Sequence, residues 1–374
     1  MSIEPWDPEA LPVVSDAALQ DRGDLISSTE LTDLDPLITD TQASAFRVVY
    51  QSTSGIDGLP VQVSGSVFRP AGPAPEGGWN IVSFGHAPAG LSAECGPSLY
   101  PNLLGFASAI ASLMKLGMVA VMTDYQGLGI SDRPHAYLEP NTAGFNVIDA
   151  VRAAKAVVPE TTSKWAAYGV AQGGQAAWSA AELADSYGTG LDFVGSVALA
   201  PTVDLVQMAE LSTTNWLTRD QQVIMPFLIA GLQSAYPEAK ETDYLHGSLA
   251  TNHAMWLACS GALADQRAKS NDKINPADTA PSTPEAAEIF KTWLTDVSLP
   301  KREASAPLLV INGGQDAVVR PMWVQHAVDV GCELGDTIQH IVRPEQTHYN
   351  LDAGGETALW LIQRFAGEPA PNDC

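Results

Sequence analysis

Tyr168–Gly174 (YGVAQGG) is the stretch of sequence that decides the fold. A predicted strand at 164–170 runs into it, and a predicted helix at 172–187 leaves it. A strand, a glycine-flanked turn and a helix are the context of a nucleophile elbow, G-x-S-x-G, in which a serine occupies the turn. The glycines permit a tight turn and let the helix pack closely on the strand.

The central position of this motif holds Ala171 instead of serine. A methyl group cannot attack a carbonyl carbon, so the chain lacks a nucleophile at the place where the motif supplies one. Two explanations stay open, an engineered Ser→Ala change that traps a substrate and a natural loss of catalysis. A phosphate-binding turn is disfavoured, because the glycines fit neither G-x-x-x-x-G-K-[ST] nor G-x-G-x-x-G.

Two further residues stand just past predicted strands, in the order that this motif requires. Asp316 follows a strand that ends at Asn312, and His348 follows a strand that begins at Thr337. The order nucleophile, acid, histidine is that of α/β-hydrolases. With serine at position 171, that serine would attack an acyl carbonyl, His348 would transfer the proton, and Asp316 would orient the imidazole. The sequence therefore predicts a Ser-His-Asp ester hydrolase site whose serine is replaced by Ala171.

An oxyanion hole needs two N–H donors that point at the developing charge. Gln172 is one candidate, because it follows the nucleophile position at the start of a helix. The second donor is expected from the loop after the strand at 79–85. Pro88 has no N–H, so we select Ala87, with Ala89 as the alternative.

Strand and helix patterns alternate along most of the chain, which predicts an α/β fold with a mostly parallel central sheet covered by helices on both faces. We expect an N-terminal arm at 1–40, an α/β-hydrolase core at 41–201 and 301–374, and a helical cap (lid) inserted at 202–300. The apolar run at 223–232, which Pro226 interrupts, is expected to line an acyl pocket through Phe227 and Leu228. Predicted strands lie at 45–53, 61–69, 79–85, 118–123, 164–170, 193–200, 307–312 and 337–343. Predicted helices lie at 103–113, with Gly117 as its stop signal, and at 143–158, 172–187, 323–332 and 356–365.

The formal net charge of −24 disfavours nucleic acid and anionic membrane surfaces as partners. No apolar run reaches the roughly 18 residues that cross a bilayer, and no signal peptide is visible in the first 30 residues. The cysteines are Cys95, Cys259, Cys332 and Cys374. They form no CxxC pair and no zinc spacing, so no metal is expected. Their even number favours two disulfides and an oxidising compartment over free thiols, with three connectivities open.

The sequence resembles the secretory lipase family, the group of lipase A-type enzymes. The resemblance rests on the oxyanion loop Gly85–Ser98 (GHAPAGLSAECGPS), on Asp124–Gly129 (DYQGLG), on the elbow Gly169–Ala177 (GVAQGGQAA), and on the end of the chain, 364–367 with Cys374. It implies hydrolysis of small-molecule or lipid esters, no cofactor or metal, and an extracytoplasmic location. It also implies the disulfides Cys95–Cys259 and Cys332–Cys374. The sequence departs from the family at Ala171 and at Ala87-Pro88.

Three functions compete on the sequence alone. The first is a secreted serine esterase or lipase in an inactive form. The second is an acyltransferase or cyclase of the same fold, which would pass the acyl group to an alcohol or amine. The third is a non-catalytic binding protein on a hydrolase fold. Asp316 and His348 argue against the third, because neither has a chemical task without a nucleophile.

Overall fold

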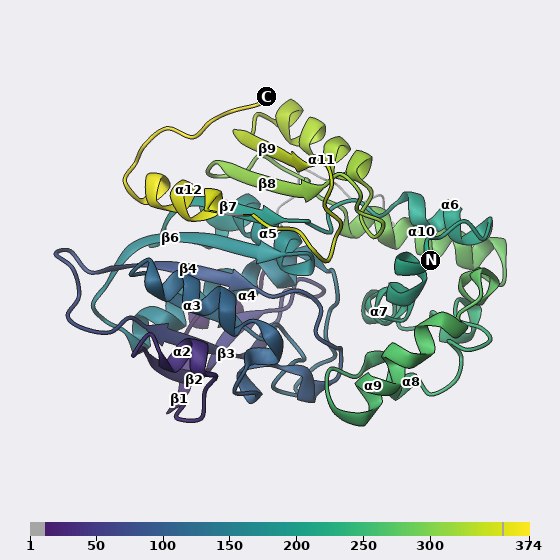
Figure 1. The fold of residues 1–374 in the computed structure, drawn as a ribbon, viewed down its shortest axis with the longest axis horizontal. Coiled ribbons are helices and arrows are strands. Elements are labelled where there is room, and N and C mark those ends of the chain that lie inside the picture. Colours follow the sequence, from purple (N-terminus) through teal and green to yellow (C-terminus); the bar gives the residue numbers. More distant parts are fainter. Residues whose placement is uncertain (1–11, 354) are drawn as a thin grey trace.

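A computed structural model describes residues 12–353 and 355–374, and within them nine strands form one sheet (Figure 1). Their spatial order is β1-β2-β3-β5-β4-β6-β7-β8-β9. The strands are β1 (Leu25–Glu30), β2 (Ser44–Thr53), β3 (Pro60–Arg69), β4 (Trp79–Gly85), β5 (Val119–Thr123), β6 (Thr161–Val170), β7 (Asp192–Leu199), β8 (Leu308–Gly313) and β9 (Ile338–Arg343).

The sheet is mostly parallel, as the alternation of strands and helices predicts. Neighbouring strands from β5 to β9 run parallel, whereas β1, β2 and β3 pair antiparallel with their neighbours. Parallel strands place their carboxyl ends at one edge of the sheet, which is where open α/β sheets bind ligands. The loops after β4, β6, β8 and β9 therefore meet at this edge.

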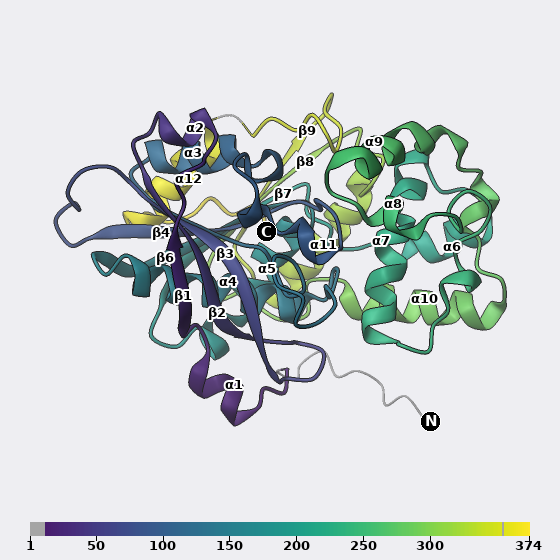
Figure 2. The same ribbon diagram turned by 90° about the horizontal axis from the view of Figure 1, so that it is seen from below.

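Helices cover both faces of the sheet (Figure 2). On one face lie α4 (Pro140–Val157), α5 (Gln172–Tyr187) and α11 (Pro321–Leu334), and on the other lie α3 (Ala107–Lys115) and α12 (Glu356–Phe365). Strand β5 shows how the pleat divides the core, since Val119 and Val121 pack with α4 and α5 while Ala120 and Met122 pack with α3 and α12. The predicted α/β-hydrolase fold class is confirmed.

Between β7 and β8 the chain forms a group of helices at one end of the sheet, drawn in green in Figure 1. We call residues 202–300 the insertion. Its α-helices are α6 (Gln207–Thr213), α7 (Arg219–Ala235), α8 (His253–Leu257), α9 (Gly261–Ser270) and α10 (Pro284–Val297). Buried side chains of α7 and α10 join one hydrophobic cluster with residues of α5, β8 and α11, so the insertion packs on the body of the protein.

Helix α7 contains the apolar run that the sequence places in the cap. It begins at a capping box, in which the Thr218 hydroxyl accepts from the Gln221 N–H and the Gln221 side chain accepts from the Thr218 N–H. The helix continues through Pro226, which is buried. The apolar residues at 223–232 therefore lie on one continuous helix, although the sequence suggested an interruption at Pro226.

The N-terminal arm expected at 1–40 does not stay apart from the core. Residues 25–30 form β1, which pairs antiparallel with β2 at the edge of the sheet. Short helices α1 (Asp16–Asp21) and α2 (Pro36–Thr39) flank this strand. The part of the expected arm at 1–11 lies outside the described residues. Because β1 is largely exposed, its sequence carries little of the apolar alternation that identifies a strand.

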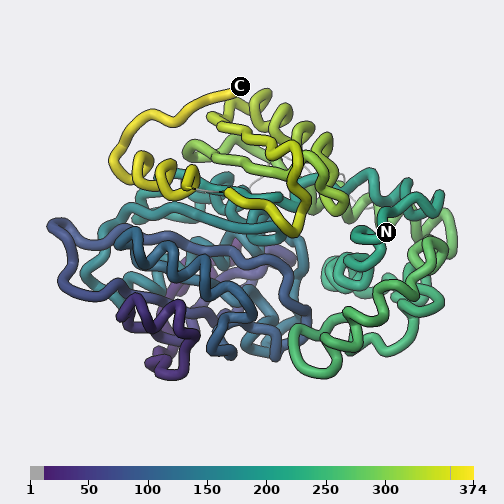
Figure 3. The backbone as a smooth tube through the Cα atoms, in the orientation of Figure 1, coloured from purple at the N-terminus to yellow at the C-terminus, as the bar shows by residue number. Residues whose placement is uncertain are grey.

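Both implied disulfides are present, so the pairing is confirmed. Cys95 bonds to Cys259 and Cys332 bonds to Cys374. The second links α11 to the end of the chain, which Figure 3 shows running back from α12 towards α11. None of the helices in the described part of the chain is both long and apolar enough to cross a bilayer.

Candidate active site

The turn between β6 and α5 holds Ala171 in a strained conformation. Its φ and ψ are 52° and −112°, a region that non-glycine residues rarely adopt. Hydrogen bonds fix the turn on both sides, since the Ala171 N–H donates to the Leu199 carbonyl at 2.8 Å and the Thr202 N–H donates to the Ala171 carbonyl at 3.2 Å. The turn is thus the one that a nucleophile elbow needs, at the residue that the sequence indicated.

Two glycines allow the elbow to pack against its neighbours. A Cβ added at Gly169 would lie 1.8 Å from the Gly173 carbonyl oxygen, and one added at Gly173 would lie 1.9 Å from the Gly85 carbonyl oxygen. Either contact is far inside van der Waals distance and meets backbone that cannot swing aside. These glycines are therefore required by close approach of α5 to β6 and β4.

Asp316 and His348 meet beyond the ends of β8 and β9. The His348 Nδ1 lies 2.7 Å from the Asp316 Oδ2. The other carboxylate oxygen, Oδ1, accepts from the N–H groups of Val318 and Val319 at 2.8 and 2.9 Å. Because the Asp316 side chain is fully buried and three donors hold it, it fixes the imidazole with Nδ1–H toward the carboxylate. The Nε2 of a neutral His348 ring is then the nitrogen that can accept a proton.

A cavity of about 480 Å³ opens beside these residues, and Ala171, His348 and Ala87 all line it. Pro88 lies in the same wall. The cavity is lined by residues of the body and of the insertion together, namely Ala87, Pro88, Tyr137, Val170, Ala171, Thr202, Val223, Ile224, Phe227, Ala264, Arg267, Ala268, Asn271, Val318, His348 and Tyr349. The structure thus brings Ala171, His348 and Ala87, which the sequence predicts as site residues, together at one opening.

Of the two predicted pocket residues, only Phe227 lines the cavity. Leu228 is fully buried in the hydrophobic cluster between the insertion and the body, so its expected place in the pocket is wrong. The physical reason is the helical phase of α7, which directs Val223, Ile224 and Phe227 to one face and turns Leu228 to another. Tyr137, Tyr349 and Arg267 are lining residues that the sequence did not indicate.

Gln172, the candidate oxyanion donor that follows the elbow, is not among the residues that line the cavity. Its backbone begins α5, and its side-chain amide Nε2 lies 2.9 Å from the Nε2 of His135. The His135 Nδ1 lies 2.8 Å from the carbonyl oxygen of Gln126. A carbonyl can only accept, so Nδ1 carries the proton and Nε2 accepts from the Gln172 amide.

His135 is neutral in this arrangement. Burial, with a smaller contribution from the nearby His86, lowers the pKa of His135 to about 4, against the opposing effect of its hydrogen bond to Gln126. Burial also lowers the pKa of His86, whose Nδ1 lies 2.7 Å from the carbonyl oxygen of Ala87. Two uncharged histidines therefore lie behind the residues selected as oxyanion donors. No sequence pattern indicated His135, since it precedes Gln172 by 37 residues in a loop.

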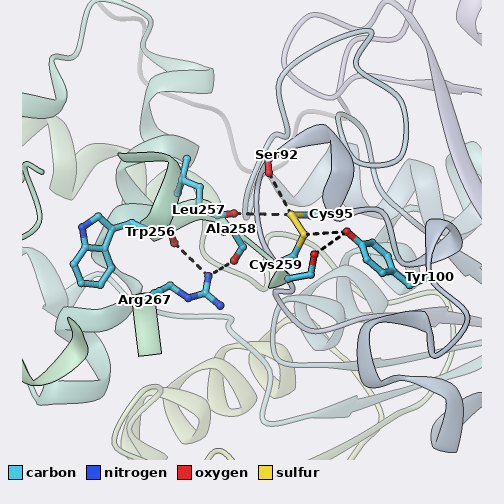
Figure 4. Close-up of a disulfide and its surroundings, with 9 residues drawn as sticks. Ser92, Cys95, Tyr100, Trp256, Leu257, Ala258, Cys259 and Arg267 are labelled. Atoms are coloured by element: carbon cyan, nitrogen blue, oxygen red, sulfur yellow. Dashed lines mark hydrogen bonds between the residues drawn. A yellow bond between two sulfur atoms is a disulfide. The ribbon is translucent and has the colours of Figure 1, made fainter. Parts of the chain in front are cut away.

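The disulfide Cys95–Cys259 joins the loop after β4 to the insertion (Figure 4). Beside it, the Leu91 N–H donates to the Leu257 carbonyl at 2.9 Å. Arg267 of α9 donates through Nη1 to the carbonyl oxygens of Trp256 and Ala258, at 3.2 and 2.6 Å. The disulfide and these hydrogen bonds thus connect two segments that contribute to the cavity lining, the loop that holds Ala87 and Pro88 and helix α9.

A model of the family described as secretory lipase matches residues 107–373. A Mycobacterium tuberculosis protein named as a probable inactive lipase is 24% identical over 344 residues, which cover 87% of this chain and 74% of that protein.

Solved structures show the same fold. Candida antarctica lipase A in its closed state has a TM-score of 0.75 and 19% identity, over 98% of this chain and 89% of that chain. The rice cell wall degrading esterase LipA from Xanthomonas oryzae has a TM-score of 0.70 and 20% identity, over 92% of this chain and 96% of that chain. With most of its length matched by the family model, this chain belongs to the secretory lipase family.

Proposed function

We propose that this chain carries the site of a serine carboxylic ester hydrolase, of the esterase or lipase kind, and that alanine at position 171 leaves it without a nucleophile. One observation carries the proposal. The hydrogen-bonded pair Asp316–His348 lines the same cavity as Ala171, which occupies a strained turn between a strand and a helix. Family membership and fold support hydrolysis of small-molecule esters.

With serine at position 171, the residues of this site would supply each step. The serine Oγ attacks the acyl carbonyl carbon while His348 Nε2 takes its proton, and Asp316 stabilises the imidazolium. The backbone N–H groups of Gln172 and Ala87 are the donors proposed for the oxyanion. The tetrahedral intermediate expels the alcohol, which receives the proton from His348. Water then attacks the acyl-enzyme while His348 takes a proton from it, and the carboxylic acid leaves as His348 returns this proton to the serine Oγ.

As it stands, the chain would bind esters without this chemistry. The name of the Mycobacterium tuberculosis relative, a probable inactive lipase, supports the same reading for a related chain. Ester binding without turnover is therefore the second candidate function, and Ala171 itself favours it. In both cases the ligand is an ester held in the cavity.

We also propose that the insertion acts as a cap over the site. Val223, Ile224 and Phe227 of α7 and Arg267 of α9 line the cavity that Ala171 lines. A cover of this kind excludes water and strengthens the electrostatic interactions inside. Phe227 would then contact the acyl or alcohol part of the ester.

Membership of a secretory family and two disulfides fit an extracellular protein. Disulfides persist in oxidising compartments and are rare in reducing ones. We propose that the protein works outside the cytoplasm, where both bonds are stable.

The test is Ala171→Ser, assayed on a panel of esters from short to long acyl chains. We expect no turnover from the present chain and clear hydrolysis from the serine variant, because loss of the nucleophile of a triad lowers kcat on the order of 10⁶-fold. The control is Ala171→Ser combined with His348→Ala, which keeps the serine and removes its base. A folded Ala171→Ser protein that hydrolyses no ester would refute the enzyme proposal.

A further inference from the structure

The cavity beside Ala171 contains one permanently charged side chain. Most of its lining is aliphatic or aromatic, and Arg267 is the only lysine, arginine, aspartate or glutamate among the described residues that line it. A guanidinium remains charged throughout the physiological pH range. A cation in such a wall needs a partner, because an unpaired charge loses hydration on burial.

Among the residues that the structure describes, hydrogen bonds hold this cation by one nitrogen. Arg267 Nη1 donates to the carbonyl oxygens of Trp256 and Ala258 (Figure 4). The guanidinium carbon lies 5.7 Å from the centroid of the Phe227 ring. Ala258 precedes Cys259, which is bonded to Cys95. The side chain is therefore positioned by a segment that is covalently tied to the body.

At the other edge of the guanidinium, the described residues provide no partner. Within residues 12–353 and 355–374, no carboxylate forms an ion pair with Arg267, and no acceptor is hydrogen-bonded to its Nε or Nη2. Burial lowers the pKa of Arg267, which is the effect of lost hydration without a compensating anion. The Nε and Nη2 edge is the one that binds a carboxylate with two parallel hydrogen bonds.

We propose that Arg267 is a specificity-determining residue that binds a carboxylate group on the ester, so that the preferred ligands are half-esters of dicarboxylic acids. The inference rests on the proposed function in taking this cavity as the ester site. The ester group of such a ligand lies at Ala171, its methylene chain contacts the apolar walls, and its carboxylate reaches Arg267. The formal net charge of −24 repels anions overall, so the attraction must come from this local cation.

A purely structural role for Arg267 makes a different prediction. If the side chain served only to hold the Trp256 and Ala258 carbonyls, its removal would lower stability and weaken charged and neutral ligands alike. Lys269 provides a matched control, because it lies on the same helix, is exposed and does not line the cavity. Lys269→Gln removes one positive charge from α9 without touching the site.

The experiment uses the present chain, in which Ala171 prevents acyl transfer. Isothermal titration at neutral pH compares monomethyl esters of linear dicarboxylic acids of increasing length with the dimethyl esters of the same acids. We expect the half-ester to bind on the order of 10- to 100-fold more tightly at one best chain length, as a bidentate charged contact allows. The hydrophobic effect alone would favour the dimethyl ester, so the sign of the preference is informative.

Arg267→Met should abolish the preference, and Lys269→Gln should leave it unchanged. Arg267→Lys keeps a positive charge on a similar aliphatic chain but loses the planar guanidinium, so it should retain only a small part of the preference. This variant provides the test if Arg267→Met fails to fold. Equal binding of half-ester and diester to the present chain, or a preference that survives in Arg267→Met, overturns the proposal. Neither outcome depends on whether Ala171→Ser hydrolyses esters, so failure of the two proposals can be told apart.

Discussion

Removal of the Cys95–Cys259 disulfide should weaken ester binding as well as stability. The bond joins residues separated by 164 positions, and Cys332–Cys374 joins residues separated by 42. In the chain-entropy model, loops of these lengths give stabilisations of about 5 and about 4 kcal/mol respectively. The double variants C95A/C259A and C332A/C374A should therefore lose similar amounts of stability.

Their effects on binding should differ. Cys259 lies between α8 and α9, and without the bond this segment contacts the loop after β4 through few polar groups, among them the Leu91–Leu257 backbone bond and the Tyr100–Ser260 hydroxyl pair. If this segment then occupies its present position against the loop after β4 only about one time in ten, ester affinity falls roughly tenfold. The second disulfide joins α11 to the chain end, and neither of its cysteines lines the cavity.

Both double variants can be unfolded in denaturant and titrated with one neutral ester under native conditions. We expect comparable losses of unfolding free energy and a loss of affinity confined to C95A/C259A. Affinity that falls equally in both variants would mean that general loosening, not the tie across the cavity, is responsible. Wild-type affinity in C95A/C259A would refute the claim that the disulfide positions the cavity wall.

Three further predictions concern the site and its support. Gly173→Ala gains about 1 kcal/mol of helix propensity but places a methyl group 1.9 Å from a backbone oxygen, so denaturant unfolding should show a net loss of unfolding free energy of about 2 kcal/mol or more. As a control, Gly355→Ala adds a methyl group that meets nothing within 4 Å and should not be destabilised. The pKa of His135 falls from 6.5 to about 4 on folding, so the folded protein binds fewer protons than the unfolded chain between these pH values. As the pH falls from 6.5 to 4, the wild type should therefore lose about 3 kcal/mol of unfolding free energy relative to His135→Asn. Parallel plots of unfolding free energy against pH for the two proteins would contradict this. Leu228→Ala should lower the unfolding free energy by about 2–5 kcal/mol and leave the ester chain-length preference unchanged, whereas Phe227→Ala should shift that preference. The reverse pattern in unfolding and titration experiments would show that the assignment of the two residues is wrong.

Local patterns predicted the elements around the elbow closely. Strand β4 (Trp79–Gly85) and helix α5 (Gln172–Tyr187) have the expected bounds, because glycines and a clear change of period mark their ends. Helix α4 begins at Pro140, three residues earlier than expected. Its start depends on the Glu139 side chain, which accepts from the N–H groups of Asn141 and Thr142, and glutamate is not a usual capping residue.

The sequence predicted the elbow, the acid and the histidine because each follows a strand at the same edge of the sheet, and strand order in the chain is enough to bring them together. The far side of the cavity could not be predicted in this way. Arg267 reaches it through the path of the insertion, which tertiary packing and the Cys95–Cys259 bond determine. Phe227 and Leu228 were given the same role because two adjacent apolar letters do not reveal which one faces outward once Pro226 is taken as a break.

The strained turn at Ala171 bears on how the chain can evolve. A left-handed backbone at a non-glycine residue costs about 1–3 kcal/mol and persists only where the surroundings impose it. Here the packing of Gly169 and Gly173 and the bond to Leu199 impose it whatever side chain occupies the turn. A change in the first base of an alanine codon gives a serine codon, and that serine would arrive in a turn already shaped for it. On the proposed function, and whichever way the alanine arose, one base change would supply the nucleophile that this site lacks.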